Sequence, residues 1–202
     1  MEGPDGGGKT TQMELLCDWL RQIGMEVVQT REPGGTPIAD KIRELLLDNS
    51  HCEMTARTEA LLYMAARAQH TAELIRPALE RGAAVISDRY SDSTLVYQGV
   101  ARGLSTSDLA WLNRFATDAL EPDLTLLLDG EAERLSARIA DRGNQDRLES
   151  EGLDFQRKVR MGFLALAKES PARVKVIDAD HPVDVVWKSI EIRIRDFLMK
   201  RG

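Results

Sequence analysis

The glycine-rich stretch GPDGGGKT, from Gly3 to Thr10, restricts the possible folds of this chain more than any other part of it. It matches the phosphate-binding pattern GxxxxGK[ST] at every fixed position. In such a P-loop the backbone N–H groups turn inward around a phosphate, Lys9 can reach the β- and γ-phosphates, and the Thr10 hydroxyl can ligate Mg²⁺. The loop should open a helix, whose first turn also favours a bound anion. We predict an ATP-phosphate site formed by Gly3, Pro4, Asp5, Gly6, Gly7, Gly8, Lys9, Thr10 and Thr11.

The residues in front of this loop are unusual for the motif. A P-loop normally follows the carboxyl end of a buried strand, yet Met1 and Glu2 are the only residues before Gly3. Two explanations remain open: the sequence begins too late, or the loop is held by other means. We expect the strand that aims the loop to be missing from this chain.

Beyond the loop, helical and strand-like patterns alternate, which predicts an α/β domain with a mainly parallel sheet. The length of 202 residues favours a single domain over residues 1–202. A loop is expected between Gly99 and Gly103, and Pro77 should bend a long helix near its end. The predicted strands cover residues 25–30, 83–87, 124–128 and 174–177, and the predicted helices cover residues 9–23, 37–46, 55–81, 105–120, 131–140, 154–169 and 183–200.

Composition excludes several classes of function. The net charge of −6 argues against a general nucleic-acid or membrane-surface binder, so an anionic substrate must be met by locally placed arginines. Cys17 and Cys52 are too few and too far apart for a disulfide framework or a zinc site, which fits a reducing compartment. No apolar run reaches the ~18 residues of a membrane span, and no signal peptide opens the chain. We interpret the protein as cytoplasmic.

Two predicted strands end in an aspartate that could hold a metal ion, Asp88 and Asp129. Ligands of open α/β sheets bind at the carboxyl ends of the strands. We favour Asp88 for Mg²⁺, because Arg89 beside it offers a partner for phosphate, whereas Asp129 has no such neighbour.

Other candidate residues are ambiguous by themselves. Tyr63 and Arg67 lie four residues apart on one helix face, a spacing that more often reflects packing and a surface charge. The polar segment at about residues 141–152 contains Arg142 and Arg147. It is either a solvated turn or a mobile lid that brings these arginines over the phosphates and excludes water.

Taken together, the motifs make the chain resemble the bacterial thymidylate kinases over nearly its whole length. The resemblance rests on the P-loop, on TREPGGT at residues 30–36, on residues 63–67, and above all on DRYSDSTLVYQ at residues 88–98. It implies a three-layer fold similar to P-loop nucleoside monophosphate kinases, with a parallel sheet in the order 2-3-1-4-5 and its first, central strand missing here. It also implies phosphoryl transfer from ATP to dTMP with Mg²⁺, and, by analogy, a homodimer.

The resemblance implies roles for the residues around the thymine base and the sugar. Tyr63 would stack on thymine, although the family usually has phenylalanine there, and Arg67 would hydrogen-bond the base O4. Thr94 and Gln98 match positions that face the base. Tyr97 matches the tyrosine near the 2′ carbon of the sugar, so it would exclude a 2′-hydroxyl.

The resemblance also implies roles for the residues around the phosphates. Arg43 and Arg89 match residues that hold the acceptor phosphate, and Asp5 matches the P-loop acid near them. Gly6 stands where one subtype carries a catalytic arginine, so the chain resembles the subtype that supplies this arginine from the lid. The sequence does not decide between Arg142 and Arg147. The implied catalytic set is Lys9, Asp88, Arg89, Arg142 and Arg147.

Two alternatives remain at this stage. The chain could be a kinase for another nucleoside monophosphate, or a remnant that binds nucleotide without turning it over. The absent strand motivates the second alternative, because its loss would leave backbone groups on residues 83–87 and 124–128 without partners, at about 1 to 3 kcal/mol each. We expect the chain to be much less stable than a version with roughly seven apolar residues added before Met1, a length taken from the family pattern.

Overall fold

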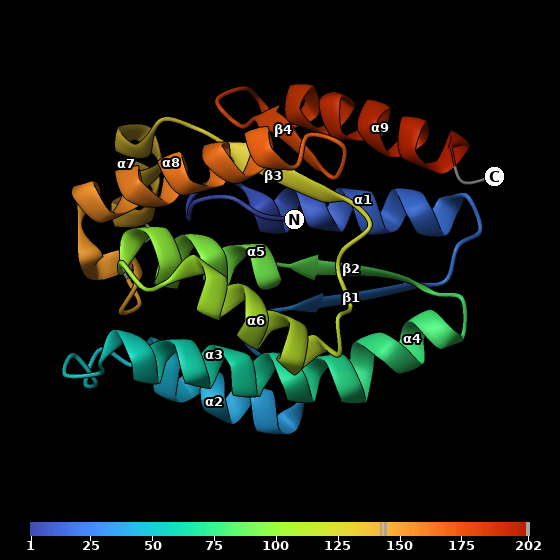
Figure 1. The fold of residues 1–202 in the computed structure, drawn as a ribbon. Helices are drawn as coiled ribbons and strands as arrows, with labels where there is room; N and C mark the ends of the chain where they lie inside the picture. Colours follow the sequence, from blue (N-terminus) through green and yellow to red (C-terminus); the bar gives the residue numbers. More distant parts are fainter. Residues whose placement is uncertain (142, 144, 201–202) are drawn as a thin grey trace.

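The computed structural model describes residues 1–141, 143 and 145–200, and its strands and helices alternate along the chain (Figure 1). The strands are β1 (Val27–Arg31), β2 (Ala84–Asp88), β3 (Thr125–Asp129) and β4 (Val174–Asp178). The α-helices are α1 (Lys9–Gln22), α2 (Pro37–Leu47), α3 (Ala56–His70), α4 (Arg76–Glu80), α5 (Ser91–Thr94), α6 (Thr106–Thr117), α7 (Ala132–Asp141), α8 (Leu153–Glu169) and α9 (Val183–Met199). Short π- or 3₁₀-helical turns are η1 (Thr71–Ile75), η2 (Leu95–Ala101) and η3 (Glu149–Glu151).

The sheet is divided into two parallel pairs, β1 with β2 and β3 with β4, and the first two residues of the chain lie between them. In Figure 1 the N-terminus accordingly sits in the middle of the molecule. Met1 and Glu2 bond to both inner strands, so the order is β1, β2, Met1–Glu2, β3, β4. The four bonds run from Met1 N to Ser87 O (2.8 Å), from Arg89 N to Met1 O (2.9 Å), from Glu2 N to Leu126 O (2.8 Å) and from Leu128 N to Glu2 O (2.9 Å).

These bonds answer the question of how the P-loop is held. The expected full-length strand is absent from the described residues, but its last two positions are present and paired on both sides. The position of Met1–Glu2 between the second and third strands of this chain agrees with the predicted sheet order.

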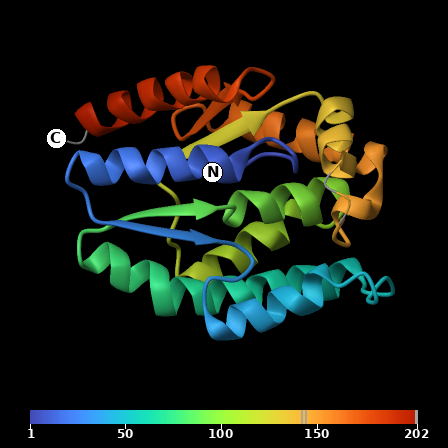
Figure 2. The ribbon, with the colours of Figure 1, turned by 180° about the vertical axis from the view of Figure 1, so that it is seen from behind.

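Helices cover both faces of the sheet, as Figure 2 shows from behind. On one face, Leu16 and Leu20 of α1 and Ile190 of α9 pack with Leu126 and Leu128 of β3. Side chains alternate between the faces of a strand, so Leu127 points to the other side. There it meets a core formed with Val96, Tyr97, Val159 and Phe163. The result is the predicted three-layer α/β arrangement.

Two local predictions need correction or refinement. Residues 91–101 are helical, so Gly99 lies inside a helical segment rather than at the start of a loop. A Cβ at Gly99 would come within 3.0 Å of Thr106 Cγ2, so glycine here allows close packing against the start of α6. The long helix expected at residues 55–81 changes to π-helical hydrogen bonding at η1, just before Pro77. Across the described residues, every helix is too short or too polar to span a membrane.

Candidate active site

A cavity of about 430 Å³ opens where the P-loop meets the carboxyl ends of β1 and β2. It brings together most of the residues that the sequence selected. The predicted site residues in its wall are Asp5, Gly6, Gly8, Lys9, Thr10, Thr11, Arg43, Tyr63, Arg67, Asp88, Arg89, Thr94, Tyr97 and Gln98. Gly3, Pro4, Gly7 and Arg147 lie behind or beside this wall, and Arg142 lies outside the described residues.

The lysine of the P-loop, Lys9, bonds to the backbone of the same loop. Lys9 Nζ donates to the carbonyl oxygens of Gly3 (3.1 Å) and Pro4 (2.9 Å). Burial, together with the nearby charge of Arg89, lowers the pKa of Lys9. Gly3 has a φ of +134°, and a Cβ there would collide with the carbonyl oxygen of Leu128, so the loop can lie against β3 only with glycine at this position.

Asp5 and Arg89 form a charge pair at the centre of the cavity wall. Arg89 Nη2 donates to Asp5 Oδ1 at 2.6 Å, and the Tyr97 hydroxyl donates to Asp5 Oδ2 at 3.1 Å. Burial alone would raise the pKa of Asp5, but the charges of Arg89 and Lys9 hold it well below its usual range. The Arg89 guanidinium also lies 5.0 Å from the centre of the Tyr97 ring, within cation–π range.

The backbone of Arg89 is itself unusual. Its φ of +68° lies in the left-handed region, which an arginine rarely adopts. Such strain persists when surrounding contacts determine the conformation, and it concentrates at functional sites. Here a second contact, from Arg89 Nη1 to Gly3 O (3.0 Å), ties the side chain to the P-loop. The strained turn therefore aims a cation from the end of β2 at the phosphate loop.

Arg67 forms the floor of the deeper part of the cavity and is only 1% exposed. Its Nε donates to Glu32 (2.7 Å), its Nη1 donates to Thr94 (2.7 Å) and Asn113 (2.6 Å), and its Nη2 donates to Tyr90 O (2.9 Å). A guanidinium carries five N–H donors, so one N–H on Nη2 remains for a ligand. The partners fix the group in place, which is how a recognition arginine is preorganised.

The other residues predicted to bind the nucleotide lie around Arg67. Tyr63, one turn before it on α3, is half-buried, and burial with the nearby Glu59 carboxylate raises the pKa of its hydroxyl. Gln98 is buried and donates to Glu59 at 2.9 Å. Arg43 donates from Nη1 to Pro33 O at 2.8 Å, and burial followed by the charge of Arg31 lowers its pKa. An arginine remains charged at neutral pH even so.

The two aspartates considered for a metal ion differ in their surroundings. Asp88 Oδ1 is buried and has no hydrogen-bond partner among residues 1–141, 143 and 145–200, and Asp88 shares the cavity wall with Thr10. Asp129 instead receives two bonds from Arg160, at 2.9 and 3.1 Å. In the described part of the chain no three His, Cys, Asp or Glu side chains form a metal cage. Mg²⁺ at a phosphate site commonly uses one or two protein ligands beside phosphate and water, so Asp88 and Thr10 suit it.

Arg147, the lid arginine that the structure describes, is buried away from the cavity. It is paired with Glu59 at 2.6 Å, and its Nε donates to Leu46 O at 2.9 Å. Burial would raise the pKa of Glu59, but hydrogen bonds from Gln98, Arg102 and Arg147 lower it. In this conformation Arg147 links the segment after α7 to two helices. Its side chain pairs with Glu59 of α3 and donates to the backbone of Leu46, the next-to-last residue of α2.

Sequence reasoning missed several residues of the site, among them Glu2 and Arg138. Glu2 is buried, and its carboxylate accepts from Tyr90 N (2.8 Å), Ser93 N (3.2 Å) and Ser93 Oγ (2.6 Å), which fixes the turn after β2. Arg138 of α7 lines the cavity and approaches Gly6 O at 3.4 Å. The available signal was its position in the predicted helix at residues 131–140, four residues before the lid residue Arg142 in the sequence.

Comparisons with known proteins agree with this arrangement. The family model described as thymidylate kinase matches residues 1–190. A curated thymidylate kinase from Exiguobacterium sp. is 47% identical over 190 residues, which cover 94% of this chain and 90% of that protein. The crystal structure of thymidylate kinase from Ehrlichia chaffeensis aligns with a TM-score of 0.77 at 33% identity and covers 95% of both chains. With its P-loop, strained arginine turn and buried Arg67 in one cavity, this chain belongs to the thymidylate kinase family.

Proposed function

We propose that this chain transfers the γ-phosphoryl group of ATP to the phosphate of dTMP and releases ADP and dTDP. The observation that carries the proposal is the Asp5–Arg89 contact of 2.6 Å, which joins the P-loop to the arginine side of the same cavity. A nucleotide held by the P-loop and a second one held near Arg43 and Arg89 would meet there. The nucleophile is already an anionic phosphate oxygen, so the reaction needs no strong general base.

The difficulty of the reaction is electrostatic. At about 4 Å and an effective dielectric near 20, two like unit charges repel by about 4 kcal/mol. Lys9, Arg43 and Arg89 line the cavity and offset this repulsion, and positioning supplies the rest. Asp88 and Thr10 would hold Mg²⁺, which when bound neutralises phosphate charge.

Selectivity for the nucleotide would come from the deeper part of the cavity. Tyr63 would stack on thymine, and the remaining N–H of Arg67 would meet the base O4 between Thr94 and Gln98. Arg67 is held by four partners, so it would bind the base without first losing side-chain freedom. Tyr97 would occupy the space beside the sugar 2′ carbon.

The lid residues would act after nucleotide binds. Arg147 would leave Glu59 and approach the transferred group, or Arg142 would do so while Arg147 keeps the base of the lid in place. Comparing Arg142→Ala and Arg147→Ala in single turnover separates these roles, because loss of the group that touches the phosphoryl slows the chemical step rather than binding.

The protein would act as a homodimer in the cytoplasm. Trp111 and Phe115 of α6 stack with ring centres 5.8 Å apart, although they are 64% and 77% exposed, and Leu61 on the neighbouring α3 is 56% exposed. Large exposed apolar side chains in one area are typical of an interface. Light scattering of the parent and of Phe115→Glu tests this, and the control is Met161→Glu on α8, where the methionine is 65% exposed. The free thiols of Cys17 and Cys52 suit a reducing compartment.

A coupled assay of ADP release with ATP and Mg²⁺ tests the proposed reaction directly. dTMP is compared with dUMP, UMP, AMP and thymidine as acceptors. We expect the highest kcat/KM with dTMP. Preference for another acceptor would identify a different nucleotide kinase, and a folded protein that binds ATP without turnover would identify a nucleotide-binding remnant.

A further inference from the structure

A buried carboxylate lies behind the wall of the nucleotide cavity. Glu59 of α3 is fully buried and accepts hydrogen bonds from several side chains. Gln98 Nε2 donates to its Oε1 at 2.9 Å, and Arg102 donates to both of its oxygens, at 3.2 and 3.1 Å. Arg147 Nη2 lies 2.6 Å from its Oε2. One amide and two arginines therefore share a carboxylate that the phosphoryl transfer itself does not use.

The arginines keep Glu59 ionised. Burial alone would raise the pKa of Glu59, but the hydrogen bonds from Gln98 and Arg102 bring it below its usual value. An ionised carboxylate accepts hydrogen bonds and donates none. At neutral pH the group that faces the Gln98 amide is therefore an acceptor only.

This acceptor fixes the orientation of the Gln98 amide. Of the two ends of the amide only Nε2 can donate, so Nε2 faces Glu59 and Oε1 points the other way. Gln98 is 1% exposed and lines the nucleotide cavity. Among the described residues its side-chain amide bonds only to Glu59. Oε1 is therefore available to a ligand as a hydrogen-bond acceptor.

The acceptor oxygen of Gln98 complements the donor on Arg67. Thr94, four residues before Gln98 on the same helical segment, accepts from Arg67 Nη1 at 2.7 Å, so both groups border the same part of the cavity. A pyrimidine with an oxygen at C4 carries an acceptor there and a donor at N3–H. A 4-amino pyrimidine carries the reverse pattern, with a donor at C4 and an acceptor at N3. The two side chains match the first pattern and oppose the second.

We propose that Glu59 is a positioning residue for base selectivity, which holds Gln98 Oε1 toward the cavity to accept from the N3–H of a 4-oxo pyrimidine. The inference rests on the proposed function, because it concerns the same acceptor nucleotide. Arg102 and Arg147 act through Glu59 as its counter-charges. Arg102 also pairs with Glu151 at 2.5 Å. The amide that reads the base is thus held in part by contacts from residues 145–151.

The test compares the binding of dTMP and 5-methyl-dCMP by titration calorimetry in the absence of ATP, so it needs no turnover. The two nucleotides share the sugar, the phosphate and the 5-methyl group and differ at C4 and N3. In Glu59→Gln the new amide can donate as well as accept, so the Gln98 amide can turn over and offer Nε2 to N3 of the cytosine ring. We expect the preference for dTMP, as the ratio of the two dissociation constants, to fall about tenfold. Arg67 is the same in both proteins, so its share of the preference cancels.

Glu151→Gln is the matched control, because it makes the same chemical change on another partner of Arg102 and leaves Glu59 intact. Its preference for dTMP should equal that of the parent. Two further variants cover the case that Glu59→Gln does not fold. Glu59→Gln/Arg102→Met restores the balance of buried charge, with Arg102→Met as its control. Gln98→Met removes the acceptor oxygen but keeps the carboxylate with both arginines. Both variants should also lower the preference.

The outcomes separate this inference from the proposed function. A merely structural Glu59 would weaken the binding of both nucleotides alike. An unchanged preference in a folded Glu59 variant or in Gln98→Met, or an equal fall in Glu151→Gln, would overturn the inference and leave the proposed function intact. Failure of the parent to bind dTMP would overturn the proposed function, and this inference with it.

Discussion

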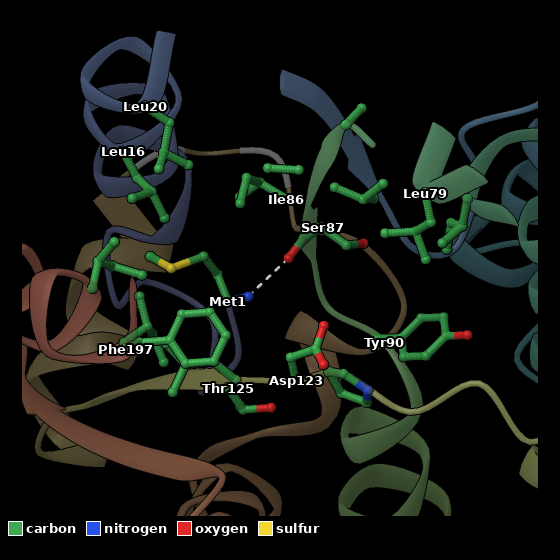
Figure 3. Close-up of a pocket in the computed structure, with 18 of the residues that line it drawn as sticks. Met1, Leu16, Leu20, Leu79, Ile86, Ser87, Tyr90, Asp123, Thr125 and Phe197 are labelled. Atoms are coloured by element: carbon green, nitrogen blue, oxygen red, sulfur yellow. Dashed lines mark hydrogen bonds between the residues drawn. The ribbon is translucent and has the colours of Figure 1, made fainter. Parts of the chain in front are cut away.

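The two cavities of this protein are nearly equal in size and opposite in chemistry. The nucleotide cavity, about 430 Å³, is lined by arginines, carboxylates and glycine backbone. The second cavity, about 410 Å³, lies between the two halves of the sheet and is lined mainly by apolar side chains (Figure 3). Arg89 borders both cavities, because its backbone N–H donates to Met1 O while its side chain contacts the P-loop. The first cavity contains charge pairs such as Asp5 with Arg89, whereas the second is bordered by apolar residues of the core. We therefore expect changes in the first to affect turnover and changes in the second to affect stability.

The largest effect should come from Arg89→Ala. The substitution removes a cation from the phosphate site and leaves Asp5 without its partner, and arginines that act on the transition state contribute about 10³ to 10⁵ in rate. We expect kcat/KM for dTMP to fall by at least about 10³-fold. Arg193→Ala, on the exposed side of α9, is the control and should keep parental activity. A loss below tenfold for Arg89→Ala would show that the charge pair is structural.

The next largest effect should come from adding about seven apolar residues before Met1, which should fill the second cavity. Each strand-edge group that gains a partner contributes about 1 to 3 kcal/mol, so the free energy of unfolding should rise by several kcal/mol. Urea denaturation of both proteins measures this. Equal melting temperatures for the two proteins would contradict the expectation.

A smaller effect concerns the selectivity for a deoxyribose over a ribose acceptor. In the proposed complex Tyr97 would leave a 2′-hydroxyl without space, and pockets that merely reject an added hydroxyl discriminate by about 10². We expect measurable turnover of UMP, about 10²-fold below that of dTMP in kcat/KM. Steady-state assays with both acceptors decide this. Equal rates would show that the tyrosine does not border the sugar.

The smallest effect should be that Asp5→Asn weakens the dependence of the folding stability on pH at acidic pH. The folded pKa of Asp5 is depressed, so its contribution is present above the usual pKa of about 3.9 and is lost as pH falls below that value. The parent should therefore lose more stability between about pH 5 and pH 3 than Asp5→Asn does. Denaturant unfolding across this range gives the two slopes. Asp196→Asn, at the exposed surface of α9, should follow the parent.

Much of the fold was predictable from periodicity alone. The four strands and the main helices begin and end within about three residues of their expected positions. The helical segment at residues 91–101 was not predicted, because its buried residues mix the polar Asp92, Ser93, Thr94 and Gln98 with the apolar Val96 and with Tyr97, so no apolar stripe results. Those polar side chains are buried because they bond to Glu2, Glu59, Arg67 and Arg173, and such long-range partners leave no local pattern.

The candidate site was predictable where a motif names residue types at fixed spacing. The P-loop and residues 88–98 gave most of the cavity wall. The partners that hold Arg67, namely Glu32 and Asn113, come from elements far apart in sequence, so spacing could not link them. The same holds for Arg147, whose pairing with Glu59 depends on how the segment after α7 folds back onto α3.

The Met1–Glu2 segment has a mechanical consequence for the reaction. Gly3 of the P-loop lies against β3, while Arg89 follows β2, so in the proposed reaction the donor would be held from one half of the sheet and the acceptor from the other. Within the described residues, strand pairing passes from one half of the sheet to the other through this dipeptide. Because Met1 and Glu2 bond to both inner strands beside this point, they hold the turn that carries Arg89 at a fixed distance from the P-loop. In the proposed reaction this spacing would set how the two nucleotides are aligned.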